Sequence, residues 1–193
     1  AIRNLQDRIQ RRLSRGKCYE PDELESIARH FPKGGVFCDI GANIGNHSLY
    51  ALRYLGAAKS IVFAPNPQAY ELLVLNLIFN GCAGQVDFSH LGLGLSDAEA
   101  EDMGLNVTEG NLGATSLQAG EGDIQVAPAD TLLGDTRVDF IKIDVEGMEL
   151  MVLSGLRQTL ARDRPPIFIE VEHKNRPGLD TWMGQAGYTL AEE

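Results

Sequence analysis

The stretch VFCDIGANIGN, residues 36–46, decides the fold of this chain, because an apolar run passes directly into a glycine-rich turn. A short apolar run that ends in glycines is typical of a buried parallel strand. Gly41 and Gly45 allow a sharp turn and a close approach of the backbone to a ligand, and Asn43 tolerates positive φ. The residues from Asn46 to Leu55 form a helical pattern, and such a helix points free N–H groups toward a ligand.

The alternation of strand and helix continues along the chain. Further strands are predicted at 60–63, 86–90, 138–144, 167–171 and 188–190, and helices at 22–31, 66–80, 148–160 and 179–186. An apolar stripe of Ile2, Leu5, Ile9 and Leu13 predicts an N-terminal helix, and residues 91–130 favour a hairpin or long loop. Strands that alternate with helices imply right-handed crossovers, and therefore an α/β fold with a mainly parallel central sheet flanked by helices.

Composition narrows the class of protein. The 193 residues suit one domain, and 44% hydrophobic with 23% charged residues exclude a disordered chain. A net charge of −10 argues against nucleic acid as a partner, and the absence of a long apolar run argues against a membrane span. The N-terminal region is charged from Arg3 onward and lacks an apolar signal core, so we expect a cytoplasmic protein. Its basic residues form either a solvated helix face or a contact for an acidic partner or another subunit.

Three cysteines without C-x-x-C spacing argue against a disulfide framework and a zinc site. Asp144 and Glu170 offer oxygen ligands that suit magnesium, but no metal ligand is predicted. In a parallel sheet, ligands bind beyond the carboxyl ends of the strands. The turn after the first strand contains neither G-x-G-x-x-G nor a phosphate loop. Its string is D-x-G-x-N-x-G, and the carboxylate of Asp39 suits a cationic amino group better than a pyrophosphate.

Four strings together resemble one family. Residues 36–46, APNP at 64–67, NLIFNG at 76–81 and VDFIKIDVEGME at 138–149 are similar to motifs of the FkbM family of class I methyltransferases. The resemblance runs from about Lys33 to Tyr188. It implies a Rossmann-like class I methyltransferase fold that uses S-adenosylmethionine to methylate a hydroxyl group of a small molecule, natural product or sugar. Residues 1–32 would form an N-terminal helical extension, and 33–193 the methyltransferase domain.

The matched strings give the predicted cofactor contacts, which are Asp39, Gly41, Ala42, Asn43, Gly45, Asn46, Pro65 and Asn66. One departure from the family concerns Ala64, which stands where the family has an acidic residue that accepts hydrogen bonds from both ribose hydroxyls. Each such bond contributes roughly 1.5–3 kcal/mol, so losing two weakens binding by about two orders of magnitude. Asn66 or Glu71 could compensate, or Ala64 is an unusual substitution.

Three residues after predicted strands are candidates for the base that an attacking alcohol needs: Asp144, Glu170 and His173. An acid that ends an apolar strand requires a partner, which favours a functional role for Asp144. His173 is either a proton-transfer group or a solvated loop residue, and Glu146 and Glu149 either cap the next helix or act in the site. His47, in the first turn after the glycine-rich loop, is expected only to contact solvent.

Two other functions stay open at this stage. A methyltransferase fold retained as a binding module is favoured by Ala64. A nicotinamide-dependent oxidoreductase is disfavoured by the missing dinucleotide fingerprint. The expected partner is a small hydroxyl-bearing acceptor, with neither nucleic acid nor membrane.

Overall fold

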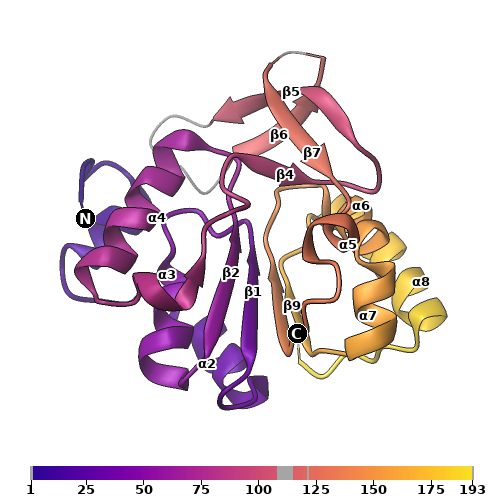
Figure 1. Ribbon diagram of the computed structural model, residues 1–193, viewed down its shortest axis with the longest axis horizontal. Coiled ribbons are helices and arrows are strands. Elements are labelled where there is room, and N and C mark those ends of the chain that lie inside the picture. The colour runs from indigo at the N-terminus through magenta and orange to yellow at the C-terminus, as the bar shows by residue number, and fades with distance from the viewer. Residues whose placement is uncertain (1, 108–114, 121, 193) are drawn as a thin grey trace.

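Five short strands form a parallel sheet at the centre of the molecule (Figure 1). The computed structural model describes residues 2–107, 115–120 and 122–192. In sheet order the strands are β3 (Val86–Asp87), β2 (Lys59–Phe63), β1 (Val36–Ile40), β8 (Phe140–Ile143) and β9 (Ile167–Ile169). All neighbouring strands pair in parallel, as the alternation of strand and helix predicted. The last predicted residues of the third strand, 88–90, lie outside β3.

Helices cover both faces of this sheet, because alternate strand residues point to opposite sides. Cys38 and Ile40 of β1 pack in one apolar cluster, and Phe37 packs in another. The first face is covered by α5 (Ala129–Leu133), α6 (Glu149–Gly155), α7 (Arg157–Asp163) and α8 (Arg176–Ala186). The second face is covered by α2 (Pro21–His30), α3 (Asn46–Tyr50), the π-helical turn η1 (Ala51–Leu55) and α4 (Pro67–Phe79). Short 3-10 turns are η2 (Ala83–Gln85) and η3 (His173–Asn175).

Helix ends follow the local sequence. The side chain of Asn66 accepts a hydrogen bond from the backbone N–H of Gln68 and so caps α4, and Pro67 occupies its first position. Gly56, with φ of 72°, ends η1. The helix predicted at 148–160 is two helices, which meet at Leu156, where φ is −104° and ψ is 8°. A Cβ at Gly155 would lie 2.2 Å from the carbonyl oxygen of Ser96, so no larger residue fits at the end of α6.

Residues 91–130 form more than the predicted hairpin. Their strands are β4 (Leu93–Leu95), β5 (Ala100–Val107), β6 (Thr115–Ala119) and β7 (Ile124–Ala127), in a second sheet of order β4-β7-β5-β6. The antiparallel β5–β6 pair is the predicted hairpin, and 108–114 and 121 lie outside the described residues. Figure 1 shows this sheet above the carboxyl ends of β1 and β2.

The two chain ends depart from the predictions. Only Arg8–Leu13 is helical in α1, and Ile2 and Leu5 precede it with exposed side chains. Ile9 alone of the predicted stripe is buried, against the neighbourhood of Ile44. No strand follows Gly187 among the residues described, up to position 192. The Tyr188 ring instead stacks on Trp182 and lies under the guanidinium of Arg164.

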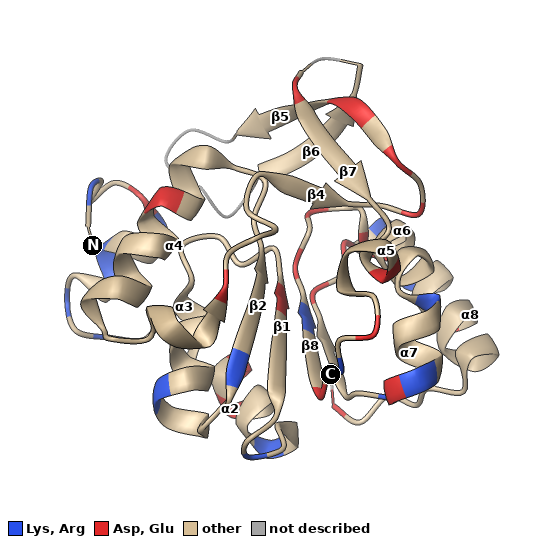
Figure 2. Cartoon of the chain, in the orientation of Figure 1, with Lys and Arg blue, Asp and Glu red and all other residues tan. Residues whose placement is uncertain are grey.

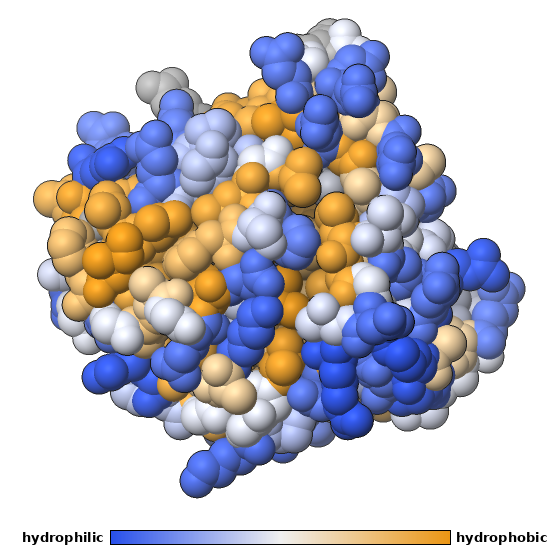
Figure 3. Space-filling view, in the orientation of Figure 1, coloured by the Kyte–Doolittle hydropathy of each residue, from blue (hydrophilic) through white to orange (hydrophobic). Residues whose placement is uncertain are grey.

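The surface is mixed. Most positions of the central strands are neither acidic nor basic, and charge lies mainly on helices and connecting segments (Figure 2). Apolar side chains reach the surface over α4 (Figure 3), where Ile78 and Phe79 are 51% and 72% exposed. None of the described helices is long and apolar enough to span a membrane.

Candidate functional site

The loop between β1 and α3 has the conformation that its glycines require. Gly41, Asn43 and Gly45 have φ of 78°, 48° and 80°, so the predicted positive φ of Asn43 is confirmed. A Cβ at Gly41 would lie 1.8 Å from the carbonyl oxygen of Asp144, and one at Gly45 would lie 2.9 Å from the Leu73 side chain. The glycines therefore let this loop press against the end of β8 and against α4.

Asp39 holds the loop from beneath. Its carboxylate accepts hydrogen bonds from the Ser48 hydroxyl at 2.6 Å and the Ser48 backbone N–H at 3.1 Å. The residue is fully buried, and burial raises the pKa of Asp39 above its usual range. This geometry supports an anchoring role for Asp39 between β1 and α3, and a direct contact with a cofactor stays a prediction.

Lys142 is a buried cation at the centre of the site. Its Nζ donates to Asp144 Oδ2 at 3.1 Å and to the Gly41 carbonyl at 3.3 Å, and lies 3.9 Å from Asp39 Oδ1. Burial alone would lower the pKa of Lys142, but Asp144 and Asp39 raise it above the ordinary value. Lys142 and Asp144 share one face of the strand, as alternation predicted, yet no role was assigned to the lysine. The sequence feature that could have identified Lys142 as a site residue is its position as a charged residue within an otherwise apolar strand.

A cavity of about 190 Å³ opens beside this lysine at the carboxyl ends of β1, β8 and β9. Five predicted residues line it, namely Gly41, Asn43, Asn46, Asp144 and Glu170. The remaining predicted residues are not among its described lining: Asp39, Ala42, Gly45, Pro65, Asn66 and His173. A larger cavity of about 640 Å³ lies beside β9, α2 and α8, and no predicted site residue lines it in the described chain.

The N-terminal segment supplies lining that the sequence pattern did not predict. Arg8, Tyr19 and Glu20 reach the small cavity, and so does His47 from α3. His47 is 5% exposed, so the expectation that it contacts only solvent is wrong: it lies near Glu23 of α2. Acidic residues at the start of a helix are stabilised by its dipole, and this explanation accounted for the acids near the start of α2. The sequence pattern therefore gave no sign that Glu20 lines the cavity or that Glu23 lies beside His47.

Several carboxyl groups crowd this cavity. Burial and the nearby Asp144 raise the pKa of Glu170 to about 7. Burial and the nearby Glu170 raise the pKa of Glu23 to about 8, and burial raises the pKa of Glu20 as well. Glu170 Oε1 and Asn43 Oδ1 are buried and accept no hydrogen bond from a described residue. The cavity therefore has acceptor groups in excess, and a cationic ligand would favour the ionised form of its carboxyl groups.

Among the described residues, the carboxyl end of β2 has no charged side chain comparable to those around the cavity. Ala64 is 2% exposed and offers no acceptor side chain, and the side chain of Asn66 already caps α4 and contacts Thr115. Glu71 pairs with Arg3 on the surface at 2.7 Å. Neither residue considered as a replacement for the missing acid is placed to serve as one in this structure.

His173 begins η3 and is exposed, so the structure does not bring it to the cavity. Its role in proton transfer stays a prediction. Glu149 accepts hydrogen bonds from the Gly147 N–H and the Asn175 side chain, and it is 1% exposed. Its position at the start of α6 matches the structural alternative, in which it holds the turn after β8.

Comparisons with known proteins agree with this geometry. The family model described as the methyltransferase FkbM domain matches residues 39–190. The chain is 26% identical to methyltransferase sdnD of Sordaria araneosa, covering 89% of this chain and 80% of the relative. It is 28% identical to hexuronic acid methyltransferase AglP of Haloferax volcanii, covering 73% of this chain and 58% of the relative.

Solved structures show the same fold. A methyltransferase FkbM from Methylobacillus flagellatus aligns with a TM-score of 0.59 and 20% identity, covering 79% of this chain and 37% of that protein. A precorrin-6y C5,15-methyltransferase from Geobacter metallireducens aligns with a TM-score of 0.56 and 17% identity, covering 88% and 70%. The predicted Rossmann-like methyltransferase fold is thus confirmed.

Proposed function

Because this chain belongs to the FkbM methyltransferase family, we propose that it transfers the methyl group of S-adenosylmethionine to a hydroxyl group of a small molecule or sugar. One observation supports this proposal above the others. The glycine-rich loop, Asp144 and Glu170 meet around one cavity at the carboxyl end of the sheet. That is where an α/β sheet binds its ligands.

The residues of the cavity fit the charged end of this cofactor. S-Adenosylmethionine carries an ammonium group and a sulfonium group, and the cavity has unpaired carboxylate and amide oxygens from Glu170 and Asn43. About 190 Å³ is below the roughly 300–1,000 Å³ of common ligand pockets. We therefore assign the cavity to the charged end and the methyl group, and the adenosine to the carboxyl end of β2 at Ala64.

The chain's own residues would act in three ways. The loop at Gly41 and Asn43 orients the cofactor, and alignment of two bound reactants lowers a barrier by up to ~7–11 kcal/mol. Bound S-adenosylmethionine supplies the electrophilic methyl group, and the hydroxyl oxygen forms its bond to carbon as the carbon–sulfur bond breaks. The carboxylate of Glu170 takes the hydroxyl proton, since a base whose pKa lies near 7 suits neutral solution. Lys142 keeps Asp144 in place.

Glu170 is a better base than Asp144 on this geometry. Asp144 is paired with the cation Lys142 at 3.1 Å, whereas the hydrogen-bond neighbour of Glu170 is another carboxyl group, that of Glu23, and burial raises the pKa of Glu170 to about 7. Proton transfer requires an acceptor oxygen that is free to meet the substrate. Asp144 then serves to hold Lys142 and the loop.

Calorimetry is the first test. We expect S-adenosylmethionine and its demethylated product to bind, and NAD not to bind. A screen of hydroxylated sugars and natural products, with detection of demethylated cofactor, then identifies the acceptor. Saturable NAD binding without S-adenosylmethionine binding would refute the proposal.

A binding module is the second candidate, and the neutral end of β2 at Ala64 is the observation that favours it. The same two measurements separate the candidates. Cofactor binding without demethylated product for any acceptor supports a binding module. Turnover with one acceptor excludes it.

A further inference from the structure

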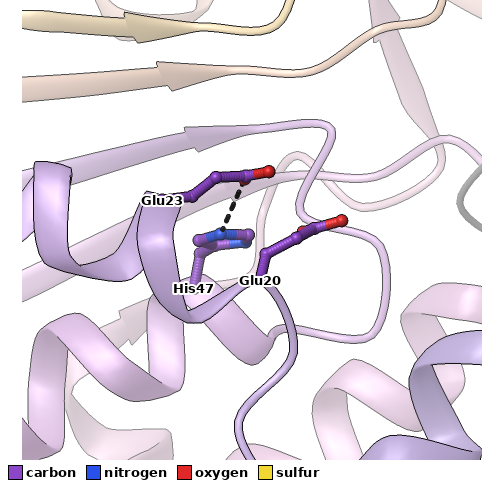
Figure 4. Close-up of side chains that lie close together, drawn as sticks. All are labelled: Glu20, Glu23 and His47. Carbon is purple, nitrogen blue, oxygen red and sulfur yellow. Dashed lines mark ion pairs between the residues drawn. The ribbon is translucent and has the colours of Figure 1, made fainter. Parts of the chain in front are cut away.

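Three potential metal ligands from two segments of the chain converge beside the small cavity. Glu20 precedes α2, Glu23 lies in its first turn, and His47 lies in the first turn of α3. One ligand atom from each lies within 4.8 Å of the other two. Figure 4 shows the Glu23 side chain above the His47 ring and the Glu20 side chain beside it.

His47 is the decisive member of this group. Its side chain is 4% exposed, and its Nε2 makes no hydrogen bond with a described residue, although Glu23 Oε2 lies 3.8 Å away. Glu23 Oε2 is also buried and without a hydrogen bond in the described chain. Two buried polar atoms that face each other at this distance are rare unless a further group lies between them.

The partner on the other ring nitrogen is suited to metal binding. The amide nitrogen Nδ2 of Asn46 lies 3.1 Å from His47 Nδ1, and in this orientation Nδ1 accepts the hydrogen bond and the ring proton is on Nε2. Rotating the Asn46 amide by 180° brings its oxygen to the same position, where it accepts from Nδ1–H and leaves the lone pair of Nε2 free for a metal. Metal-bound histidines commonly have such a partner on the second nitrogen.

The neighbouring carboxyl groups also favour a cation. Burial raises the pKa of Glu20 and Glu23, and nearby carboxyl groups raise both further, Asp144 for Glu20 and Glu170 for Glu23, so a cation is needed to keep both ionised. The buried cation Lys142 is engaged with Asp144 and Asp39. One divalent ion between the three ligand atoms would offset this crowding.

We propose that Glu20, Glu23 and His47 form a binding site for a divalent transition metal ion. One imidazole and two carboxylates suit Zn²⁺ or Mn²⁺ better than Mg²⁺ or Ca²⁺, which prefer oxygen ligands alone. Ligand atoms around a tetrahedral zinc lie roughly 3.4 Å apart, close to the observed 3.8 Å between His47 and Glu23.

The ion would join the N-terminal segment to the loop that follows β1. No metal was expected from the sequence, since Glu23 and His47 are 24 positions apart and match no ligand motif. Binding of the ion does not depend on the proposed methyl transfer, so the two can fail separately.

Metal-free full-length chain, prepared with a chelator, is titrated with Zn²⁺ and Mg²⁺ by calorimetry and with Mn²⁺ by electron paramagnetic resonance. We expect one site for Zn²⁺ or Mn²⁺ per chain and much weaker binding of Mg²⁺. His47→Asn and Glu23→Gln should each lower the affinity at least about tenfold, since disturbing even the outer partners of a metal ligand costs 10–100-fold. Circular dichroism confirms that each variant is folded.

Two variants outside the group serve as controls. His30→Asn removes a histidine that contacts Glu192, and Glu25→Gln removes an exposed acid on the same helix. Both should bind the metal as the unaltered chain does. Absence of stoichiometric binding, or equal affinity in all four variants, would overturn the proposal.

S-Adenosylmethionine binding is measured in parallel with chelator present. Cofactor binding without metal binding refutes the metal site alone. Metal binding without cofactor binding supports the metal site and refutes the proposed function. A histidine-dependent shift of the manganese spectrum distinguishes coordination by His47 from loose attraction to carboxylates.

Discussion

The carboxyl edge of the parallel sheet has two unlike ends. Beyond β1, β8 and β9, the carboxylates of Asp144 and Glu170 surround a small cavity with Lys142 beneath it. Beyond β2, Ala64 is buried and neutral, and Asn66 is occupied with capping α4. One edge of one sheet therefore combines a strongly charged end with an uncharged one.

The difference between the two ends indicates how the free energy of ligand binding is divided between them. Hydrogen bonds to a charged group contribute about 1.5–3 kcal/mol each, so a ligand gains most at the charged end. At the other end Ala64 offers no charged group, so backbone and apolar contacts must hold the ligand. The comparison predicts that substitutions at the charged end change chemistry, and that substitutions at the neutral end change affinity.

The largest effect is expected from Glu170→Gln, which removes the proposed base while preserving shape. Turnover should fall by about 10²–10⁴-fold, the usual contribution of a general base, and cofactor affinity should change far less. Rates with a confirmed acceptor and calorimetry test this. Glu172→Gln is the matched control, because that acid pairs with Lys174. Full turnover in Glu170→Gln would assign the base to another residue.

Gly41→Ala comes next, because the charged end depends on the close approach of this loop to β8. A Cβ there would lie 1.8 Å from the Asp144 carbonyl, at a φ of 78°. We expect the free energy of unfolding to fall by about 3 kcal/mol or more, since a clash adds to the strain of positive φ. Urea denaturation measures it.

Gly81→Ala is the control for that substitution. Gly81 has φ of 68° and nothing within 4 Å of the position of a Cβ. Strain alone should cost about 1–2 kcal/mol there. Equal losses at both positions would show that conformation, rather than contact with β8, sets the requirement for glycine at position 41.

The sequence predicted the parallel sheet and, at the charged end of its carboxyl edge, the site residues Asp144 and Glu170. Buried strands such as β1 and β8 are apolar except for one charged residue each, Asp39 and Lys142, and the turns after them contain Gly41 and Asp144. These signals are local in the chain. The shared face of Lys142 and Asp144 followed from strand periodicity alone.

The rest depended on tertiary packing. The second sheet has strands such as β5, in which half of the residues are exposed and only one is buried, so hydrophobicity did not reveal it. Glu20 reaches the cavity, and Glu23 lies beside His47, because α2 packs on the same face of the sheet as α3, and no local pattern specifies that contact. His47 is buried by the same packing.

A smaller effect is expected at the neutral end from Ala64→Glu. An ionised acceptor for ribose hydroxyls should tighten S-adenosylmethionine binding by about tenfold or more. Calorimetry compares the two proteins, and circular dichroism confirms the fold. Glu71→Gln should leave affinity unchanged, because Glu71 pairs with Arg3. Weaker binding in Ala64→Glu would show that the site is packed around alanine.

The smallest effect concerns how β3 is held beside β2, near the neutral end. Asp87 of β3 accepts a hydrogen bond from Lys59 at 2.7 Å, and this contact lowers the pKa of Asp87 to about 2. The unfolded value is near ~3.9, so the ionised pair stabilises the fold above about pH 4, and this contribution disappears as pH falls to about 2. Lys59 is 42% exposed, so we expect Asp87→Asn to cost about 1 kcal/mol or less at pH 7.

Urea denaturation from pH 7 to pH 2 should show the two proteins converge in stability as the solution becomes acidic. Glu101→Gln, at an exposed position of β5, should not show this convergence. A difference between Asp87→Asn and the unaltered chain that persists at pH 2 would mean that Asp87 acts through packing of β3, and not through its charge.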